Sequence, residues 1–447
     1  MSRAAALRVA RRLQSAGHEA LFAGGSVRDR LRGVEPHDHD VATSARPEEV
    51  QGLFERTVGV GAAFGVILVV IDDEQIEVAT FREDHGIADG RHPASVRFTD
   101  ARADALRRDF TINGMFEVPE TGEVLDFVGG RADLEARCIR TIGDPDARFR
   151  EDRLRILRAI RFATVLDFRI DPDTMAAVRT HAPAIDDVSA ERIRDELTKM
   201  LVSGRGGRGV GLLKEAGLLR RLLPEVNALD GVAQPARFHP EGDVLTHTRM
   251  LLDGYRRGGP AVALAALLHD IGKESTACIN DKGREAFPNH AKVGAAMATD
   301  VCRRLRYPNR VTETVNDLVL RHMDWPALPQ MREAKRRRML LEEDFALHME
   351  LHRLDCEACH RDLSIHDYAW EQRRKIEAEP PPIAPLLNGH ALKEMGFTPS
   401  PAFKTMLDAL VDAQLEERVT DADEAQAFIR SRFAPPDGRP LAGETSI

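Results

Sequence analysis

The fold of this chain is decided by the stretch Leu21-Phe22-Ala23-Gly24-Gly25-Ser26-Val27-Arg28-Asp29, which is followed by Asp38-His39-Asp40. The apolar run breaks at Gly24-Gly25, and Val27 to Leu31 predicts the first turns of a helix. A strand that ends in a glycine turn and opens a helix leaves backbone N–H groups free to hold a phosphate. Arg28 adds a cation beside those donors. The stretch therefore predicts a phosphate site at a strand-to-helix turn.

The acidic pair Asp38 and Asp40 is expected in the next strand, where residues two apart point to the same face. Two carboxylates on one face suit one or two Mg²⁺ ions near a triphosphate. Taken alone, a Gly-Gly turn and an Asp-x-Asp pair on a solvated strand edge are both common. Their order along this chain favours a nucleotide site.

The order Gly-Gly-x-Val-Arg-Asp followed by Asp-x-Asp resembles the nucleotidyltransferase head of the polymerase-beta superfamily. More narrowly it is similar to the bacterial branch that holds tRNA CCA-adding enzymes and poly(A) polymerases. The resemblance continues motif by motif to about Leu201 and more loosely beyond. It implies an α+β fold: a head with a mixed sheet, then an all-helical neck, a body of the HD type and a tail.

Length and composition fit that organisation. At 447 residues, two to four domains are expected. No run of about 18 apolar residues exists, so no membrane span is predicted. Five scattered cysteines favour a reducing, cytoplasmic setting, and arginine-rich Met1–Gln14 has the spacing of a first helix rather than of a signal peptide. The net charge of −9 decides little about nucleic acid, because local basic surface is what binds phosphates.

Further along the head, the sequence predicts a helix at 47–54 and strands at 66–71 and 75–80. Glu77, in the second strand, is either a third carboxylate of the acidic pair or an ordinary exposed residue. Residues 81–97 are polar and predict a flexible loop, in which Arg91-His92-Pro93 resembles a family motif. Arg107-Arg108-Asp109-Phe110-Thr111-Ile112-Asn113 also matches the family, which implies that Arg108 binds the nucleotide, as do Gly25 and Arg28.

From about residue 149 the apolar period changes to that of helices. The predicted domains are a head at 1–140, a nucleotide-recognition neck at 141–225, a body at 226–379 and a tail at 380–433. Residues 434–447 are expected to be disordered.

A helix is predicted from Glu151 to Phe162, with Asp152, Arg155, Arg158 and Arg161 recurring every three residues on one face. The same spacing also suits a surface helix with ion pairs. An Asp–Arg pair side by side offers one acceptor and several donors in a plane. Adenine and cytosine match that pattern, whereas guanine and uracil would leave two buried groups unpaired, at roughly 1–3 kcal/mol each. The family's Glu-Asp-x-x-Arg motif, assigned this role, matches Glu151, Asp152 and Arg155, and Arg158 and Arg161 match further nucleotide contacts.

In the body, His247, His269-Asp270 and His290 resemble the HD phosphohydrolase superfamily, and such ligands suit Mn²⁺, Ni²⁺, Fe²⁺ or Mg²⁺. Met323 stands after His322 where some relatives carry the closing aspartate, so a mononuclear site and a decayed site both stay open.

Two patterns have simpler explanations. Cys356-Glu357-Ala358-Cys359-His360 spells a haem attachment pattern inside a helical run, and the basic run 335–338 is a solvated face or a tRNA phosphate contact.

The resemblance implies template-independent addition of C, C and A to the tRNA 3′ end from CTP and ATP, with two Mg²⁺ on Asp38 and Asp40. Poly(A) polymerase and CC-only or A-only addition are the alternatives. The stretch 61–65 lacks the basic pair of the poly(A) branch, which favours CCA addition. A non-catalytic RNA-binding head with a working HD site is a further alternative. The sequence does not indicate an oligomeric state.

Overall fold

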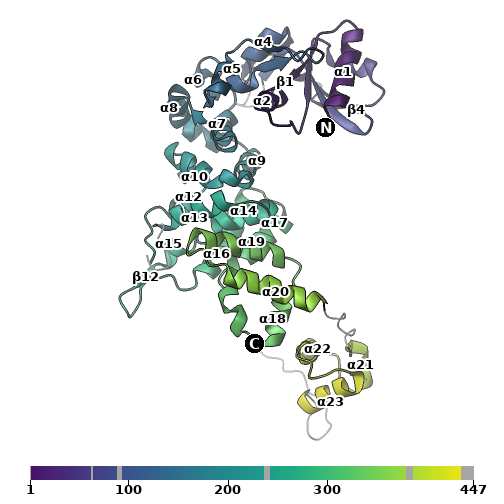
Figure 1. Cartoon of the computed structure of the whole chain (residues 1–447), viewed down its shortest axis with the longest axis vertical. Helices are drawn as coiled ribbons and strands as arrows, with labels where there is room; N and C mark the ends of the chain where they lie inside the picture. Colours follow the sequence, from purple (N-terminus) through teal and green to yellow (C-terminus); the bar gives the residue numbers. More distant parts are fainter. Residues whose placement is uncertain (1, 62–63, 88–92, 236–241, 379–385, 434–447) are drawn as a thin grey trace.

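The computed structural model describes residues 2–61, 64–87, 93–235, 242–378 and 386–433. The chain is elongated, with the N-terminal sheet domain at one end and three C-terminal helices at the other (Figure 1). The region between these two ends is almost entirely helical. This is the predicted arrangement of a mixed-sheet head followed by helical regions. The predicted domain limits at 140, 225 and 379 stay predictions, and the expected disorder of 434–447 falls outside the described residues.

A mixed seven-stranded sheet forms the head, in the order β3-β4-β5-β2-β1-β8-β9. Only β2 and β5 run parallel; the other neighbours are antiparallel. The strands are β1 (Ala20–Ala23), β2 (Asp40–Thr43), β3 (Thr57–Gly61), β4 (Val66–Ile71), β5 (Glu74–Thr80), β8 (Met115–Glu117) and β9 (Val124–Asp126). The predicted strands at 66–71 and 75–80 are confirmed as β4 and β5.

The register of three central strands brings the first predicted site residues to one end of the sheet. Ala23, the last residue of β1, pairs with Asp40, the first residue of β2. Val41 pairs with Val78, so Glu77 lies level with Asp40 on the parallel neighbour. The Gly24-Gly25 turn leaves β1 at this same end and enters α2 (Gly25–Leu31), as the sequence predicts. The glycine turn and the carboxylates therefore share one edge.

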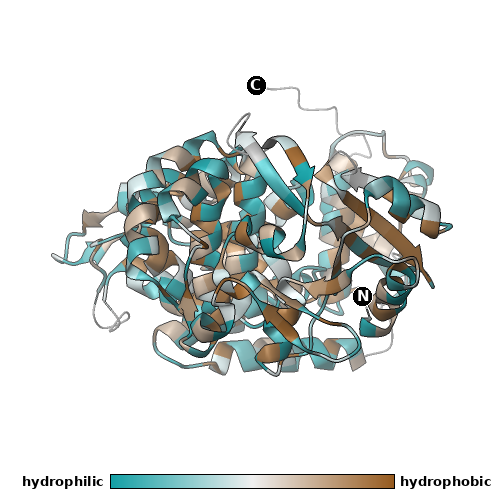
Figure 2. Cartoon of the chain, turned by 90° about the horizontal axis from the view of Figure 1, so that it is seen from above, coloured by the Kyte–Doolittle hydropathy of each residue, from teal (hydrophilic) through white to brown (hydrophobic). Residues whose placement is uncertain are grey.

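Both faces of the sheet are covered by apolar packing. On one face lie α1 (Arg3–Ser15), whose Val9 and Leu13 are buried, and α3 (Pro47–Leu53). A separate cluster on the other face includes Phe81, Phe116 and residues of α4 (Ala101–Leu106). Seen from above, apolar stretches are visible in the sheet region (Figure 2), and β4 is apolar throughout. The first helix and the helix at 47–54 are confirmed.

The predicted loop at 81–97 is wrong. Two strands, β6 (Arg82–Ile87) and β7 (Pro93–Phe98), form an antiparallel hairpin with Arg82 opposite Phe98. The polar composition misled the prediction, because a hairpin that stands outside the main sheet needs no apolar alternation. Its start is fixed by charge: the Arg82 guanidinium pairs with Asp84 at 3.0 Å. Arg91 and His92 fall outside the described residues.

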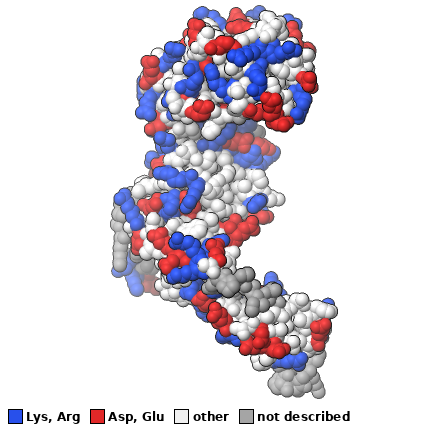
Figure 3. Space-filling model, turned by 45° about the vertical axis from the view of Figure 1, so that its right-hand side comes forward, with Lys and Arg blue, Asp and Glu red and all other residues white. Residues whose placement is uncertain are grey.

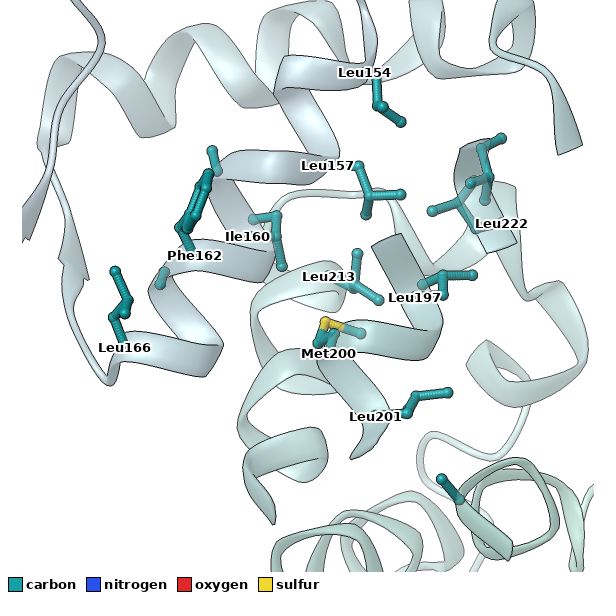
Figure 4. Packing of buried hydrophobic residues seen from close by; sticks show 14 of the residues in the cluster. Leu154, Leu157, Ile160, Phe162, Leu166, Leu197, Met200, Leu201, Leu213 and Leu222 are labelled. Carbon is teal, nitrogen blue, oxygen red and sulfur yellow. The ribbon is translucent and has the colours of Figure 1, made fainter. Parts of the chain in front are cut away.

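After the head, short elements lead into the neck: η2 (Thr111–Asn113), α5 (Gly130–Glu135) and the two-stranded parallel pair β10 (Cys138–Ile139) and β11 (Arg169–Ile170). The neck helices are α6 (Pro145–Glu151), α7 (Leu154–Leu166), α8 (Pro172–His181), η3 (Ala182–Asp187), α9 (Ala190–Met200), η4 (Leu201–Arg205), α10 (Gly206–Glu215), α11 (Leu219–Leu222) and α12 (Pro224–Asn227). Leu157 and Ile160 of α7 face Leu197, Met200 and Leu213 (Figure 4). This core holds the inner side of α7 and leaves its arginine side toward the head.

The body contains α13 (Val244–Gly254), α14 (Gly259–Leu268), α15 (Lys273–Thr276), the hairpin β12 (Cys278–Ile279) and β13 (Glu285–Ala286), α16 (His290–Arg304), α17 (Asn309–Arg321), η5 (Trp325–Gln330), α18 (Glu333–Leu340), α19 (Phe345–Ala358) and α20 (Ser364–Ala378). Helix α14 is buried along nearly its whole length and forms the centre of this bundle. The tail helices α21 (Gly389–Glu394), α22 (Ala402–Leu415) and α23 (Ala422–Phe433) have an apolar core of their own. Among the described helices, none has the length and apolar character to cross a bilayer.

Candidate functional site

A cleft of about 890 Å³ opens between the edge of the sheet and the neck. Pockets of roughly 300–1,000 Å³ are typical of small-molecule sites. Its lining includes eight of the nine predicted head and neck residues: Gly25, Arg28, Asp40, Arg108, Asp152, Arg155, Arg158 and Arg161. Lys and Arg side chains gather over the exposed face of the head (Figure 3). The size and the arginine-rich walls suit an anionic ligand such as a nucleotide.

The glycine turn allows an arginine to approach the backbone. Gly24 has φ +70°, and a side chain there would place its Cβ 3.2 Å from Nη1 of Arg108. Arg108 is held by Asp104, which accepts its Nε–H at 3.1 Å and an Nη2–H at 3.0 Å. Its guanidinium also lies 4.8 Å from the ring centre of Phe116. The turn and Arg108 thus form one corner of the cleft.

Arg28 is 8% exposed and points into the same cleft. Its Nη1–H donates to Oδ1 of Asn113 at 2.7 Å, and Asp29 accepts from Nε and Nη2 at 2.9 and 2.8 Å. Phe162 lies under the guanidinium at 5.5 Å. Because a charged group is fixed in this way on several sides, Arg28 is pre-oriented toward a ligand.

The acidic group consists of Asp40, Glu77 and Asp38, but not as the sequence predicted. Only Asp40 is in β2; Asp38 is exposed in the segment before the strand and is not part of the cleft lining. Glu77 lines the cleft beside Asp40, so of the two predictions for this residue the structure favours a member of the acidic group. Burial, together with the negative charges of Glu77 and Asp38 and against the opposing charge of Arg108, raises the pKa of Asp40 to about 6. A cation would relieve that concentration of negative charge.

The predicted continuous helix from Glu151 to Phe162 is wrong at its start. Helix α6 ends at Glu151, Asp152 has the extended values φ −141° and ψ 106°, and α7 begins at Leu154. Asp152 accepts a hydrogen bond from the Leu154 N–H at 3.1 Å. A carboxylate that bonds a free N–H at the start of a helix favours a break at its own position, which the three-residue spacing does not reveal.

Asp152 and Arg155 both line the cleft, but they do not pair with each other. Arg192 of α9 donates from Nη2 to both oxygens of Asp152, at 3.1 and 2.9 Å. Arg155 donates to Glu151 at 2.6 Å and to the backbone carbonyl of Arg107 at 3.0 Å. The sequence analysis missed Arg192, because it lies on another helix far along the chain.

Two further ion pairs tie α7 to its surroundings. Asp109 accepts from Nε and Nη2 of Arg158 at 2.9 and 2.6 Å. Burial alone would raise the pKa of Asp109, yet Arg158 and Asn113 hold it at about 2. Arg161 donates to Glu196 at 2.5 Å and lies 3.7 Å over the Phe162 ring. The arginines of α7 are therefore anchored by carboxylates from the head and from α9.

A second site lies in the body, where five helices or their ends (α13, α14, α16, α17 and α19) bring together His247, His269, Asp270, His290, His322 and Asp355. His247 Nε2 is 3.1 Å from Oδ1 of Asp355, and His269 Nε2 is 3.1 Å from Oδ2 of Asp270. A carboxylate reaches this cluster from another helix, Asp355 of α19. Met323 itself is 53% exposed, and the mononuclear and decayed alternatives both stay predictions.

The tautomers of three of these histidines are fixed by backbone carbonyls three residues earlier in the chain. Nδ1 of His269, His290 and His322 lies 3.1, 2.9 and 2.7 Å from the carbonyl oxygens of Ala266, Phe287 and Val319. A carbonyl only accepts, so each Nδ1 carries the proton and each Nε2 presents a lone pair to the centre. This outer contact is typical of histidines that bind metals.

Among the described residues of this centre, Nε2 of His269 and Oδ1 of Asp270 are buried and have no hydrogen-bond partner. A buried polar atom without a partner is rare, because desolvation without compensation is unfavourable by about 1–3 kcal/mol. Both atoms face the other ligands. The donor set of imidazoles and carboxylates therefore fits a divalent cation.

The structure shows how the two patterns with simpler explanations are packed. Cys356 is buried within α19 and Cys359 ends it, with Sγ 3.6 Å from Nδ1 of His247. The segment is a packed helix next to the second site. In the basic run, Arg336 and Arg337 pair with Glu333, and Arg338 pairs with Asp412 of the tail at 2.5 Å. Three of the four basic side chains thus have carboxylate partners.

Three parts of the chain match models of known protein families. Residues 20–140 match the family model of the Poly A polymerase head domain, residues 167–229 that of the "Probable RNA and SrmB- binding site of polymerase A", and residues 243–349 that of the HD domain. The chain is 46% identical to the CCA-adding enzyme of Enterococcus faecalis over 202 residues, and 43% identical to that of Geobacillus thermodenitrificans over 214. These matches cover 44% and 48% of this chain and 50% and 53% of the relatives.

The structural similarity extends over more of the chain than the sequence similarity does. The structure of the Bacillus stearothermophilus CCA-adding enzyme in complex with CTP matches with a TM-score of 0.73 at 27% identity, covering 96% of each chain. The Thermotoga maritima CCA-adding enzyme complexed with tRNA matches with a TM-score of 0.56 at 18% identity, covering 96% of this chain and 94% of that one. By sequence, the chain spans about half the length of the curated relatives it matches. The chain is thus similar to the CCA-adding enzymes, and parts of it match the models of a poly(A) polymerase head domain and of an HD domain.

Proposed function

We propose that this protein adds C, C and A to the 3′ end of tRNA, using CTP and ATP and no template. One observation carries the proposal: Asp40, Glu77, Arg28 and Arg108 of the head line the same cleft as Asp152 and Arg155 of the neck. Phosphoryl transfer needs its charges held near the reacting phosphate, and nucleotide choice needs a donor and an acceptor near the base. Residues able to serve both purposes line this one cleft.

The residues take the following roles. Arg28 and Arg108 bind the triphosphate beside the Gly24-Gly25 turn. Asp152 accepts from the amino group of cytosine or adenine, and Arg155 donates to the ring nitrogen. Asp38 and Asp40 would hold Mg²⁺, which would supply Lewis-acid activation of the 3′-hydroxyl and neutralise charge on the leaving pyrophosphate. Arg158 and Arg161, anchored by Asp109 and Glu196, extend the cationic wall toward the substrate.

The test uses the full chain and a tRNA transcript that ends before its CCA. With labelled nucleotides supplied singly, CTP should be added twice, UTP and GTP hardly at all, and ATP only after CTP. Long runs of A from ATP alone would show a poly(A) polymerase instead. Addition that stops at CC, or that adds A only to a tRNA already ending in CC, would show a partial activity.

A second activity is favoured by the buried centre in the body. We propose that His247, His269, Asp270 and Asp355 hold a divalent cation (Mn²⁺, Ni²⁺, Fe²⁺ or Mg²⁺) and that the body hydrolyses a phosphate ester. A 2′,3′-cyclic phosphate or a 3′-phosphate on a damaged tRNA end is the proposed substrate, because such ends lack the hydroxyl that the head must use. A bound divalent cation lowers the pKa of a water ligand and so supplies the nucleophile.

This activity is tested by phosphate release from tRNA ending in a 3′-phosphate or a cyclic phosphate, after incubation with each metal. The variant His269→Ala with Asp270→Ala should lose metal-stimulated release and keep nucleotide addition. If the wild-type protein releases no phosphate with any of these metals, the body is not a phosphohydrolase.

A further inference from the structure

Two polar side chains beside the buried centre of the body are in contact with each other. Lys273, three residues after Asp270, is 6% exposed, and Gln234, in the segment between α12 and α13, is 7% exposed. Nζ of Lys273 lies 2.7 Å from Oε1 of Gln234 and 2.7 Å from Oδ2 of Asp270. The pair of Lys273 and Gln234 therefore borders the proposed cation site.

The contact fixes which way the carboxamide of Gln234 is turned. An ammonium group only donates hydrogen bonds, so the atom of the carboxamide that faces Nζ is its oxygen. The amide nitrogen Nε2, with its two N–H donors, then lies on the other side of the carboxamide. Among the residues that the structure describes, Nε2 of Gln234 has no hydrogen-bond partner although it is buried. A buried donor without an acceptor is unfavourable, which indicates that Nε2 donates to a group that binds here.

The ammonium next to this donor is held in place on a further side. The ring centre of Phe287 lies 5.4 Å from Nζ of Lys273. The backbone carbonyl of Phe287 is also the group that orients His290, whose Nδ1 lies 2.9 Å from it. One residue thus contacts both the ammonium and a histidine of the cluster. The donors of Lys273 and Gln234 are therefore arranged before any ligand arrives, which lowers the entropic cost of binding.

The charge around Gln234 indicates what kind of ligand fits. Lys273 carries a positive charge within the wall, and a cation held by His269 and Asp270 would add more beside it. A water molecule could accept a hydrogen bond from Nε2 but would leave that positive charge unmatched. An anionic oxygen accepts the hydrogen bond and matches the charge, and hydrogen bonds between charged partners are the stronger ones. Phosphoryl oxygens have both properties.

We infer that Gln234 is a phosphate-binding residue of the body: Nε2 donates to a non-bridging oxygen of a phosphoryl group, and Oε1 keeps the ammonium of Lys273 beside that group. The inference rests on the proposed hydrolysis of a phosphate ester for the identity of the ligand and names a residue that selects it. Gln234 takes no part in bond breaking. Its loss should therefore raise the KM for tRNA ending in a 3′-phosphate more than it lowers kcat.

Binding of inorganic phosphate to the full-length, Mn²⁺-loaded protein tests the inference without any turnover. Equilibrium dialysis with labelled phosphate measures it. Because the arginines of the head also bind anions, binding in the body is taken as the part that is lost in the variant His269→Ala with Asp270→Ala.

The informative variant is Gln234→Glu, which keeps the shape and the oxygen that faces Lys273 but replaces the N–H donors by a charged acceptor. It should weaken phosphate binding in the body about 10-fold or more, with bound manganese and the thermal midpoint little changed. Gln330→Glu makes the same change at an exposed position of η5 and should have no effect. Equal phosphate binding by the wild type and Gln234→Glu, or no phosphate binding in the body of the wild type, would overturn the inference.

Nuclear magnetic resonance of the wild-type protein decides the matter if Gln234→Glu does not fold. With isotope-labelled glutamine, the buried amide of Gln234 is recognised by the slow exchange of its hydrogens with solvent. Saturating inorganic phosphate in the presence of Mg²⁺ should shift this resonance, and an unshifted resonance would refute the contact. Phosphate that binds through Gln234 but is not released from tRNA ends would support the binding role and refute the proposed hydrolysis.

Discussion

The head cleft and the buried centre of the body, both proposed here as cation sites, have opposite constructions. Asp40 and Glu77 are oxygen ligands at the open edge of a sheet, and arginines stand around them. The centre at Asp270 is enclosed by helices, and most of its ligands are imidazoles. Hard oxygen ligands in an open cleft suit Mg²⁺ that arrives with a triphosphate, whereas enclosed imidazoles suit a resident transition metal. If both proposals hold, ligand type and access would keep the two metals of this chain apart.

Removing one site at a time tests most directly whether the two sites act independently. Asp40→Asn should lower nucleotide addition by about 10³-fold or more and leave phosphate release from 3′-phosphorylated tRNA within a factor of two, because the body shares no ligand with the cleft. Initial rates of both reactions on the same preparations would check this. His269→Ala is the matched control, with the reverse result expected. Parallel loss of both activities in either variant would show that the sites are coupled.

The next prediction concerns how Asp152 selects the base in the cleft. Asp152→Ala should reduce discrimination between CTP and UTP by about 1–3 kcal/mol, or roughly 5- to 150-fold, because the acceptor for the cytosine amino group is lost. The ratio of kcat/KM for the two nucleotides measures it, and tRNA affinity by filter binding serves as the control. A variant that still selects CTP as well as the parent would place base reading elsewhere.

Acid stability tests how the neck is joined to the head. The pKa of Asp109 is about 2 in the folded chain, below its usual value near 3.9. A lowered pKa means that stability is present above pH 4 and is lost as the pH falls toward 2. The contribution is about 2 kcal/mol. Urea midpoints of wild type and Asp109→Asn between pH 5 and pH 3 should converge, and a constant difference across that range would contradict the assignment.

The smallest effect is expected where the body meets the tail. Arg338 pairs with Asp412, and their side chains are 45% and 28% exposed. Exposed pairs of this kind contribute about 0–1 kcal/mol. Arg338→Ala should therefore shift the thermal midpoint by no more than about 4 °C, with Lys335→Ala as the control on the same helix. A much larger shift would indicate that this pair is needed to dock the tail.

What the sequence could predict follows from how local each interaction is. The strand, glycine turn and helix around Gly24 depend on residues next to one another, and they are found as predicted. The hairpin at 82–98 was missed because its pairing stands outside the amphipathic sheet and leaves no apolar period. Asp355 was missed because it joins His247 across the packed body, more than a hundred residues along the chain. Arg192 was missed for the same reason: no spacing in the sequence links α9 to Asp152.

The pairing of His247 on α13 with Asp355 on α19 has a consequence for how the body holds together. Ligands on α13 and α19 come into contact only when the helical bundle is folded. A cation bound there would therefore stabilise the folded state. Binding at a hundred times the dissociation constant would add about 2.7 kcal/mol to the free energy of unfolding. The body links the head to the tail. Selection for its stability would then retain these histidines even in a descendant that had lost the hydrolytic reaction.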